Sequence, residues 1–391
     1  MKNFDFYSPT KIFFGKDRES EIGSILKSYN FKKVLIVIGK SSVVKSGLLD
    51  RVVSSLKQEN IESFLLSGVR ANPTFDLVKQ GVELAKTNNI DIILPIGGGS
   101  VIDTAKCIAV NYYYSGDVKD FNLHIANPMK ALPIGVILTI SAAGSELSNS
   151  CVIQDDETQM KIGFNSDLIR PLFVIENPEL TKSVSKEQTA YGIVDILMHT
   201  LERYMCDSEE YELADEFALG LIKNVIDVGL LCYNNPDNYD YRGRIMLASS
   251  LSHNGITGIG KPFMMAVHQL EHPVSGMFPN IAHGCGLAVL WPAWARYYYR
   301  YDIDKFAKLG ERVFNLSIVD KEKAALATIE KFEEYFKKLG MPSTLSELDI
   351  NEEDVNKLVE NMTRKGTRVV KHHAKDMDAE VAKSIYLSCL K

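Results

Sequence analysis

The sequence lacks the features that mark a membrane, secreted or nucleic-acid-binding protein. No stretch approaches the roughly 18 uninterrupted apolar residues of a membrane-spanning helix, and the opening Met-Lys-Asn-Phe-Asp contains no apolar signal segment. The net charge of −6 gives no electrostatic attraction to nucleic acid or to an anionic membrane. The six cysteines include no C-x-x-C pair, which fits a reducing compartment rather than a disulfide framework. We therefore expect a soluble cytoplasmic protein, most simply an enzyme, with no nucleic-acid or membrane partner.

The first half of the chain alternates short β-branched runs with helical stretches, and the 391 residues are enough for two domains. The expected strands are residues 33–38, 63–69, 91–96, 132–140 and 172–175, with a hairpin of residues 151–154 and 161–164. The expected helices run from the turn at 39–42 to about residue 58, from 75 to 87, and from 101 to 110. Strands that alternate with helices predict βαβ units and a mostly parallel sheet.

The second half has a different pattern, because long periodic apolar segments replace the strands after Asn177-Pro178. Ser185-x-x-Gln188 resembles a capping box at the start of a helix. Further helices are expected at residues 210–224, 241–251, 321–339 and 352–363. We place the domain boundary between residues 178 and 179, so that an α/β domain spans 1–178 and a helical domain spans 179–391. The segment Lys371-His372-His373 is expected to be a solvated polar patch.

A triple-glycine turn, Gly97-Gly98-Gly99-Ser100, lies between an expected strand and an expected helix. Glycines there permit positive φ and close approach of a ligand, and the helix N-terminus favours a phosphate or pyrophosphate. The turn is neither a Walker A loop nor a full G-x-G-x-x-G, since Ile102 occupies the third glycine position. A simple tight turn therefore remains an alternative. The small-residue loop of residues 139–144 follows another strand and is expected at the same edge of the sheet, where such sheets bind ligands.

A carboxylate and several histidines form the second candidate site. Asp195 and His199 are four residues apart, as are His268 and His272, and His283 follows eleven residues later. Positions i and i+4 lie on one face of a helix, so each pair can direct both side chains to one point. Asp and His side chains that converge in this way form a site for a divalent transition metal. The alternative for Asp195 and His199 alone is an ion pair on a helix surface.

A competing interpretation comes from residues 268–272, which spell the H-x-x-E-H signature of an inverted zinc-peptidase motif. In that interpretation Glu271 is the general base. Pro273 should break the helix soon after the motif, which counts against it. The peptidase hypothesis also leaves the glycine turn and Asp195 without a role.

Taken together, these motifs resemble the iron-containing (group III) alcohol dehydrogenases, in their butanol dehydrogenase branch. The resemblance covers nearly the whole chain. Its motifs are residues 9–15 (Pro-Thr-Lys-Ile-Phe-Phe-Gly), Gly97-Gly98-Gly99-Ser100-x-x-Asp103, Leu138-Thr139-x-Ser141-Ala142-x-Gly144-Ser145-Glu146, Gly192-x-x-Asp195-x-x-x-His199-x-x-Glu202, His268-x-x-x-His272 and His283-Gly284.

This resemblance implies a Rossmann-like dinucleotide-binding domain, an all-α metal-binding domain of the dehydroquinate synthase-like fold, and a homodimer. The implied metal is Fe²⁺, with Zn²⁺ as the alternative, and its implied ligands are Asp195, His199, His268 and His283. His272 is the implied catalytic histidine beside the nicotinamide. The implied cofactor residues are Asn72, Gly97, Gly98, Gly99, Ser100, Asp103, Thr139, Ser141, Lys161 and Leu180.

One turn bears on the choice of cofactor. Members of this family that prefer NAD often carry an Asp after the first strand of the nucleotide fold, whereas this chain has Gly39, Lys40, Ser41 and Ser42 there. A carboxylate would repel a 2′-phosphate, but Lys40 and two hydroxyls can bind one. We therefore expect NADP(H) to be preferred over NAD(H).

The expected reaction is oxidation of short aliphatic primary alcohols such as butanol, and reduction of aldehydes such as butanal. The apolar stretch of residues 263–265 is expected near the substrate. Three alternatives stay open besides the peptidase. They are an NAD-linked polyol dehydrogenase, a lyase such as dehydroquinate synthase, and a protein that binds metal and nucleotide without turnover.

Overall fold

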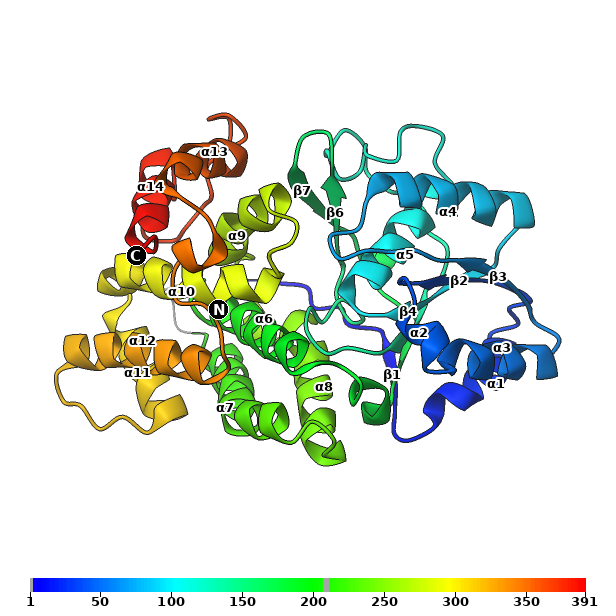
Figure 1. Cartoon of the computed structure of the whole chain (residues 1–391), viewed down its shortest axis with the longest axis horizontal. Helices are drawn as coiled ribbons and strands as arrows, with labels where there is room; N and C mark the ends of the chain where they lie inside the picture. The colour runs from blue at the N-terminus through cyan, green and yellow to red at the C-terminus, as the bar shows by residue number, and fades with distance from the viewer. Residues whose placement is uncertain (1–2, 207–210) are drawn as a thin grey trace. The chain divides into compact units, whose positions relative to one another are not determined.

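The computed structural model describes residues 3–206 and 211–391, which form two compact units (Figure 1). One unit comprises residues 7–183, and the other comprises the described residues from 184 onward together with residues 3–6. The boundary expected between residues 178 and 179 lies inside the short 3-10 helix η3 (Pro178–Thr181).

The first unit is built on a six-stranded sheet in the order β1-β8-β5-β4-β2-β3, and every neighbouring pair is parallel. Its strands are β1 (Lys11–Phe14), β2 (Lys33–Ile38), β3 (Glu62–Leu66), β4 (Ile92–Gly97), β5 (Gly135–Leu138) and β8 (Phe173–Glu176). An antiparallel hairpin consists of β6 (Ser150–Asp155) and β7 (Met160–Asn165). The predicted parallel sheet and hairpin are therefore confirmed. The edge strand β1 was not predicted.

Helices accompany the sheet; one near the N-terminus was not predicted, and the helix expected up to about residue 58 is divided into two. The helices are α1 (Ile22–Ser28), α2 (Ser42–Lys45), α3 (Leu48–Gln58), α4 (Phe75–Asn88) and α5 (Gly99–Asn111). Every residue of β4 is buried, as expected for a central parallel strand that is covered on both faces. Ile36, Leu94 and Ile137 belong to one buried cluster of this unit, and it spans β2, β4 and β5.

The second unit is helical, and no strand longer than an isolated bridge occurs among its described residues. Its helices are α6 (Lys186–Tyr204), α7 (Glu212–Asn234), α8 (Tyr239–His253), α9 (Ala266–Met277), α10 (His283–Tyr298), α11 (Ile303–Phe314), α12 (Lys321–Lys338), α13 (Glu352–Met362) and α14 (Ala379–Ser388). The all-helical second half is confirmed. Residue 210, the expected start of α7, lies outside the described residues.

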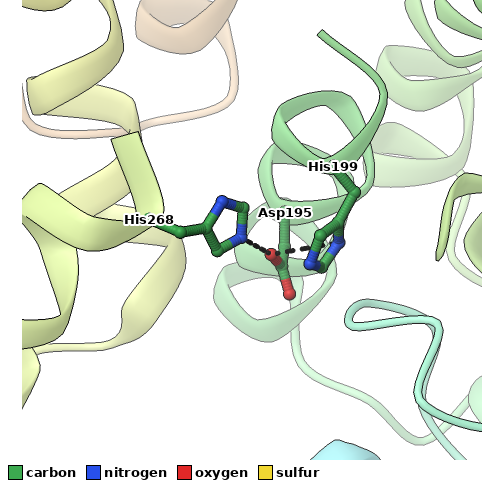
Figure 2. A group of neighbouring side chains, drawn as sticks. All are labelled: Asp195, His199 and His268. Atoms are coloured by element: carbon green, nitrogen blue, oxygen red, sulfur yellow. Dashed lines mark ion pairs between the residues drawn. The ribbon is translucent and has the colours of Figure 1, made fainter. Parts of the chain in front are cut away.

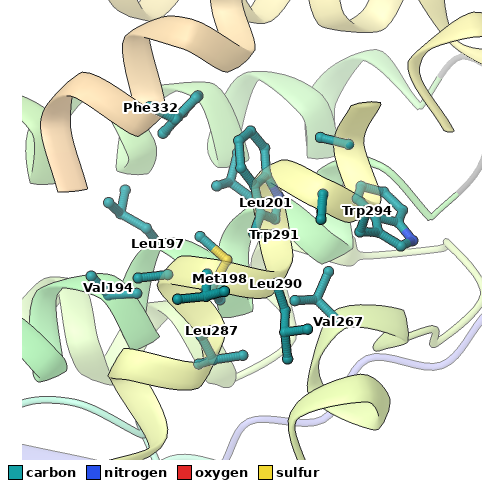
Figure 3. Close-up of a cluster of buried hydrophobic side chains, with 14 of the residues drawn as sticks. Val194, Leu197, Met198, Leu201, Val267, Leu287, Leu290, Trp291, Trp294 and Phe332 are labelled. Atoms are coloured by element: carbon teal, nitrogen blue, oxygen red, sulfur yellow. The ribbon is translucent and has the colours of Figure 1, made fainter. Parts of the chain in front are cut away.

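A buried apolar cluster joins α6, α9, α10 and α12 (Figure 3). Figure 3 labels Val194, Leu197, Met198 and Leu201 from α6, Val267 from α9, Leu287, Leu290, Trp291 and Trp294 from α10, and Phe332 from α12. The rings of Trp291 and Phe332 meet edge to face, with centroids 4.8 Å apart. Aromatic pairs of this kind add stability beyond the area that they bury. The cluster therefore packs α6, α9 and α10 together, and these three helices carry the candidate metal ligands.

The start of α6 follows the sequence prediction. Ser185 is the N-cap residue, and its hydroxyl accepts a hydrogen bond from the backbone N–H of Gln188 at 3.2 Å. The prediction for α9 was wrong, because the helix continues through Pro273 to Met277. Proline removes one backbone donor, but the next turn of α9 still forms.

All six cysteines are buried as free thiols. None of the helices in the described residues combines the length and apolar character needed to cross a membrane.

Candidate metal and nucleotide sites

Three side chains from two helices meet in the helical unit (Figure 2). Asp195 and His199 lie one turn apart on α6, and His268 projects from α9. Asp195 Oδ1 lies 3.5 Å from His199 Nδ1 and 3.4 Å from His268 Nε2. One ligand atom from each residue lies within 4.8 Å of the other two. The structure thus brings together three of the four side chains that the resemblance implies as metal ligands.

The donor atoms of this group fit a cation. Asp195 Oδ1, His199 Nδ1 and His268 Nε2 are buried, and they make no hydrogen bond of normal geometry with the described residues. Unsatisfied buried polar atoms are costly, and a metal ion compensates them. Burial by itself raises the pKa of Asp195, but the imidazoles of His199, His268 and His283 lower it well below its usual value. Burial lowers the pKa of His199. Both side chains are therefore deprotonated, as ligands must be.

His283 and His272 lie at the edge of this group. His283 is the first residue of α10, and its Nε2 lies 3.9 Å from Asp195 Oδ1. The His283 ring centroid is 5.2 Å from that of His268. His272 lies one turn beyond His268 on α9, with its ring centroid 6.4 Å from His268 and 6.1 Å from His283. The geometry therefore gathers all five of the predicted side chains in one region of the helical unit.

Glu202 fixes the orientation of His268. It lies on α6, and its carboxylate contacts Nδ1 of His268 while also accepting hydrogen bonds from the backbone N–H groups of Val267 and His268. These amides belong to the first turn of α9, where a carboxylate is favoured by the helix dipole. Burial disfavours a charged His268, yet Glu202 and Asp195 raise its pKa to about 9. Because Nδ1 is held by Glu202, Nε2 faces Asp195.

Glu271 has the same relation to His283. Its fully buried carboxylate contacts Nδ1 of His283, and it also accepts a hydrogen bond from Ser275 Oγ at 3.1 Å. Gly286 makes room for it, since a Cβ there would lie 2.8 Å from Glu271 Cγ. A carboxylate that orients a histidine in this way is not placed to activate water. The geometry therefore opposes the peptidase interpretation of residues 268–272.

The sequence did not reveal what Glu202, Glu271 and His253 do around the histidines. His253 ends α8, and its ring meets that of His199 with centroids 4.2 Å apart. Glu202 did leave a signal, because the spacing Asp195-x-x-x-His199-x-x-Glu202 places all three on one face of α6. Glu271 and His253 reach their partners only through tertiary packing.

In the sheet unit, the glycine turn differs from expectation in one respect. Neither Gly97, Gly98 nor Gly99 has positive φ. The glycines are needed for packing instead, because a Cβ on Gly98 would lie 2.2 Å from Ile140 Cγ2. Gly98 is the N-cap residue of α5, so that Ser100 lies within the first turn of the helix.

The two candidate nucleotide loops lie together, as predicted. Leu138 at the end of β5 pairs with Gly97 at the end of β4, and Thr139 N donates to Gly97 O at 3.1 Å. The turn of residues 39–42 follows β2, which is the neighbour of β4 on its other side. Three strands therefore end in candidate loops at the same edge of the sheet, the edge at which parallel sheets bind ligands.

A buried lysine that sequence analysis overlooked anchors the second loop. Lys106 Nζ, on α5, donates to the backbone oxygens of Ser145, Ser148 and Ser150 at 2.7, 2.9 and 2.8 Å. Burial lowers the pKa of Lys106 to about 8, and the nearby Asp103 carboxylate acts in the opposite sense. Asp103 itself accepts hydrogen bonds from Ser145 Oγ at 2.6 Å and Val152 N at 2.9 Å. The carboxylate of Asp103 therefore joins α5 to the loop and the hairpin.

The remaining predicted cofactor residues lie in separate elements of the same unit. Lys40, Ser41 and Ser42 are exposed, and Ser141 is partly exposed in its loop. Asn72 has a left-handed backbone conformation, with φ of 55°, just before α4. Lys161 lies on β7, close enough to Asp103 to lower its pKa, although burial has the larger, opposite effect. Leu180 packs partly buried against the core cluster of β2 and β4.

The prediction for residues 371–373 was wrong in part. Lys371 is exposed, but His372 is buried, and the side chain of His373 is only 11% exposed. His372 packs against Tyr298, with ring centroids 4.2 Å apart. The polar sequence gave no sign of this tertiary contact.

Comparison with known families defines the class of protein. Residues 9–178 match the model for iron-containing alcohol dehydrogenase. Residues 189–387 match the model for the C-terminal part of the Fe-containing alcohol dehydrogenase family. The chain therefore belongs to the iron-containing alcohol dehydrogenase family.

Individual relatives indicate the type of dehydrogenase within this family. NADH-dependent butanol dehydrogenase A of Clostridium acetobutylicum is 39% identical over 369 residues, which cover 93% of this chain and 94% of the relative. NADPH-dependent aldehyde reductase YqhD of Escherichia coli is 30% identical over 390 residues, covering 99% of each chain. The crystal structure of NADH-dependent butanol dehydrogenase A from Thermotoga maritima has a TM-score of 0.96 at 34% identity, covering 100% of this chain and 99% of that chain. The chain is thus an alcohol or aldehyde dehydrogenase of the butanol dehydrogenase and YqhD type.

Proposed function

We propose that this protein is a metal-dependent, NADP(H)-linked dehydrogenase that interconverts short aliphatic primary alcohols and their aldehydes, such as butanol and butanal. The observation that carries the proposal is the convergence of Asp195, His199 and His268 in a chain of this family. The substrate class follows the names of the butanol dehydrogenases and of the aldehyde reductase among its relatives.

The proposed ligands are Asp195, His199, His268 and His283, with Fe²⁺ as the first choice of metal and Zn²⁺ as the second. Imidazole and carboxylate suit both ions. Such a cation supplies Lewis acidity, which favours loss of an alcohol proton and polarises an aldehyde carbonyl. The chain's own contribution is to hold the ligands rigidly, since Glu202 and Glu271 fix the rings of His268 and His283.

His272 is proposed to exchange the substrate proton. Its ring lies beside His268 and His283 but outside the tight group of ligand atoms. An imidazole takes up and releases protons near neutral pH, as general acid–base catalysis requires. The nicotinamide provides the hydride acceptor or donor.

The proposed nucleotide site comprises the loops at the carboxyl ends of β2, β4 and β5. Gly97, Gly98, Gly99 and Ser100 would hold the pyrophosphate at the start of α5, and Asp103, Thr139, Ser141, Asn72, Lys161 and Leu180 would line the rest of the site. The preference for NADP(H) rests on the turn after β2, where Lys40 is exposed and no acid is present. Named relatives include both NADH-dependent and NADPH-dependent enzymes, so their names do not decide between the two cofactors. The proposed preference therefore depends on this turn.

The activity can be tested by NADPH oxidation with butanal, using metal-stripped protein and protein restored with Fe²⁺ or Zn²⁺. Restoration should recover activity, whereas His268→Ala should remain inactive with either metal. His124→Asn is the matched control, because His124 is exposed and its left-handed backbone suits asparagine. Equal activity of the stripped and restored proteins would exclude the metal-dependent mechanism.

The cofactor proposal has its own test in kcat/KM for NADPH and NADH. Lys40→Asp should shift the ratio toward NADH by at least about tenfold, because a carboxylate repels a 2′-phosphate. Lys45→Asp introduces the same charge change at an exposed position of α2 and should leave the ratio nearly unchanged. A wild-type enzyme that uses NADH more efficiently than NADPH would refute the proposed preference.

A further inference from the structure

A second group of metal-ligating side chains lies elsewhere in the helical unit. Asp302 stands between the 3-10 helix η5 (Tyr299–Tyr301) and α11, and His372 and His373 belong to the segment before α14. One ligand atom from each residue lies within 4.8 Å of the other two. None of the three takes part in the site formed by Asp195, His199 and His268.

The distances suit a shared cation. His373 Nε2 lies 2.9 Å from one oxygen of Asp302 and 3.0 Å from the other. Ligand atoms about 2.0–2.2 Å from one Zn²⁺ ion lie roughly 3–4 Å from each other. A direct Asp–His hydrogen bond has the same separation, so this contact alone does not distinguish the two arrangements.

The nitrogen atoms of the two rings provide the distinction. His372 Nε2 and His373 Nδ1 are buried and have no hydrogen-bond partner among the described residues. A satisfied Asp–His pair accounts for neither of them. An ion held by Nε2 of His373 cannot also reach Nδ1 of the same ring, so it would satisfy only Nε2 of His372. The ring proton of His372 would then move to Nδ1 and replace the 3.3 Å hydrogen bond that Nδ1 accepts from Ala374 N.

The segment that carries the histidines is well fixed. Val370 and Met377 exchange two backbone hydrogen bonds, of 3.1 and 2.9 Å, which close the loop between them. His372 N donates to Asp376 Oδ1 at 3.2 Å, and Tyr298 Oη donates to the backbone oxygen of Lys375 at 3.0 Å. The ligands are therefore held before a cation arrives, which lowers the entropic cost of binding.

The nearby lysines contact groups other than the Asp302 carboxylate. Lys305 Nζ donates to Tyr204 O at 2.8 Å, and Lys261 pairs with Asp215. Lys371 pairs with Asp376, and Lys375 Nζ donates to Tyr297 Oη at 2.7 Å. Each lysine is thus engaged with another group, and among the described residues the side chain that contacts the Asp302 carboxylate is that of His373.

We propose that Asp302, His372 and His373 bind a second divalent transition-metal ion, of which Zn²⁺ is the natural probe. Three protein ligands leave one position for water. The ion would tie the loop of residues 370–377 to the start of α11. The binding energy of a metal held only by the folded chain would add to its stability.

The number of Zn²⁺ ions per chain tests this proposal. After zinc loading and removal of free metal, elemental analysis should give two equivalents for the wild type and one for Asp302→Asn, which preserves the shape of the side chain. Asp304→Asn, at an exposed acid two residues away, should retain two equivalents. Zinc should also raise the unfolding temperature of stripped wild-type protein more than that of Asp302→Asn. His373→Gln provides a second variant that keeps a hydrogen bond to Asp302.

This count separates the second site from the catalytic site proposed above. If only the catalytic site exists, the wild type and Asp302→Asn hold one equivalent each and His268→Ala holds none. If only the second site exists, the wild type and His268→Ala hold one equivalent each and Asp302→Asn holds none. The first pattern overturns the second site, and the other pattern overturns the catalytic metal.

Discussion

The carboxylate of Glu202 contacts Nδ1 of His268 from the neighbouring helix, and it caps the first turn of α9 at the same time. One acidic side chain on α6 therefore sets both the position of α9 and the direction in which His268 points. The opposite nitrogen of the ring, Nε2, lies 3.4 Å from Asp195 Oδ1 as a result.

Glu202→Gln should weaken metal binding by about 10–100-fold, because an amide holds the histidine ring less firmly than a carboxylate does. The affinity can be measured by competition of a coloured chelator for Zn²⁺ or Co²⁺. Glu187→Gln changes an exposed glutamate on the same helix and should bind metal like the wild type. Equal affinities in the two variants would show that Glu202 supports the helix without tuning the site.

Metal affinity should rise with pH across the neutral range. Although burial opposes it, Glu202 and Asp195 raise the pKa of His268 to about 9 in the metal-free chain, so His268 is protonated below that pH. Asp195 and His199 have lowered pKa values and are already deprotonated. A cation that displaces one proton gains about tenfold in affinity per pH unit up to about 9. Titrations between pH 6.5 and 8.5 check the slope, and a flat profile would contradict it.

Gly284→Ala should destabilise the helical unit. A Cβ at Gly284 would lie 2.6 Å from the Cα and O atoms of Tyr191 on α6, and backbone atoms cannot move aside as a flexible side chain can. Overpacking of this kind costs about 1–3 kcal/mol. Gly220→Ala is the matched control, since Gly220 is exposed on α7 with nothing within 4 Å of the added carbon. It should stabilise the helix by about 0.5–1 kcal/mol. Denaturant unfolding that ranks the two variants in the reverse order would refute the argument.

Lys106→Met should destabilise the sheet unit strongly. Three backbone oxygens, of Ser145, Ser148 and Ser150, lose their common donor, and Asp103 loses a nearby positive charge. Breaking a buried ionic contact costs about 3–5 kcal/mol, which lowers the unfolding temperature by roughly 6–20 °C in a unit of this size. Lys79→Met, at an exposed position of α4, should change it by less than about 2 °C. Similar melting curves for both variants would show that the lysine is dispensable.

Much of the fold can be predicted because strong local patterns agree with the tertiary structure. The β-branched run of β2 and the apolar run of β4 are buried throughout most of their length, and their sequences show it. The edge strand β1 was missed because none of its four residues is buried, so its sequence does not show a core-facing run. Helix α9 passes Pro273, against its local propensity, since tertiary packing around Leu270 and Val274 overrides it.

The residues of the candidate site were also predicted only where a local sequence pattern reveals them. The i, i+4 spacings on α6 and α9 revealed Asp195, His199 and His268, because helical geometry alone aligns such pairs. Glu271 and Lys106 act on partners from other elements, and no spacing in the sequence encodes those contacts. His372 was misjudged for the same reason, since its polar neighbours in sequence conceal its burial against Tyr298.

The six buried thiols have a practical consequence for following the chain's motions. Cys107 and Cys151 belong to the sheet unit, whereas Cys206, Cys232, Cys285 and Cys389 belong to the helical one. An alkylating reagent reaches each sulfur only while its surroundings are transiently open. Pulsed alkylation followed by peptide mass spectrometry would therefore measure the rate of local opening in each unit separately. The experiment uses the wild-type protein and needs no attached dye.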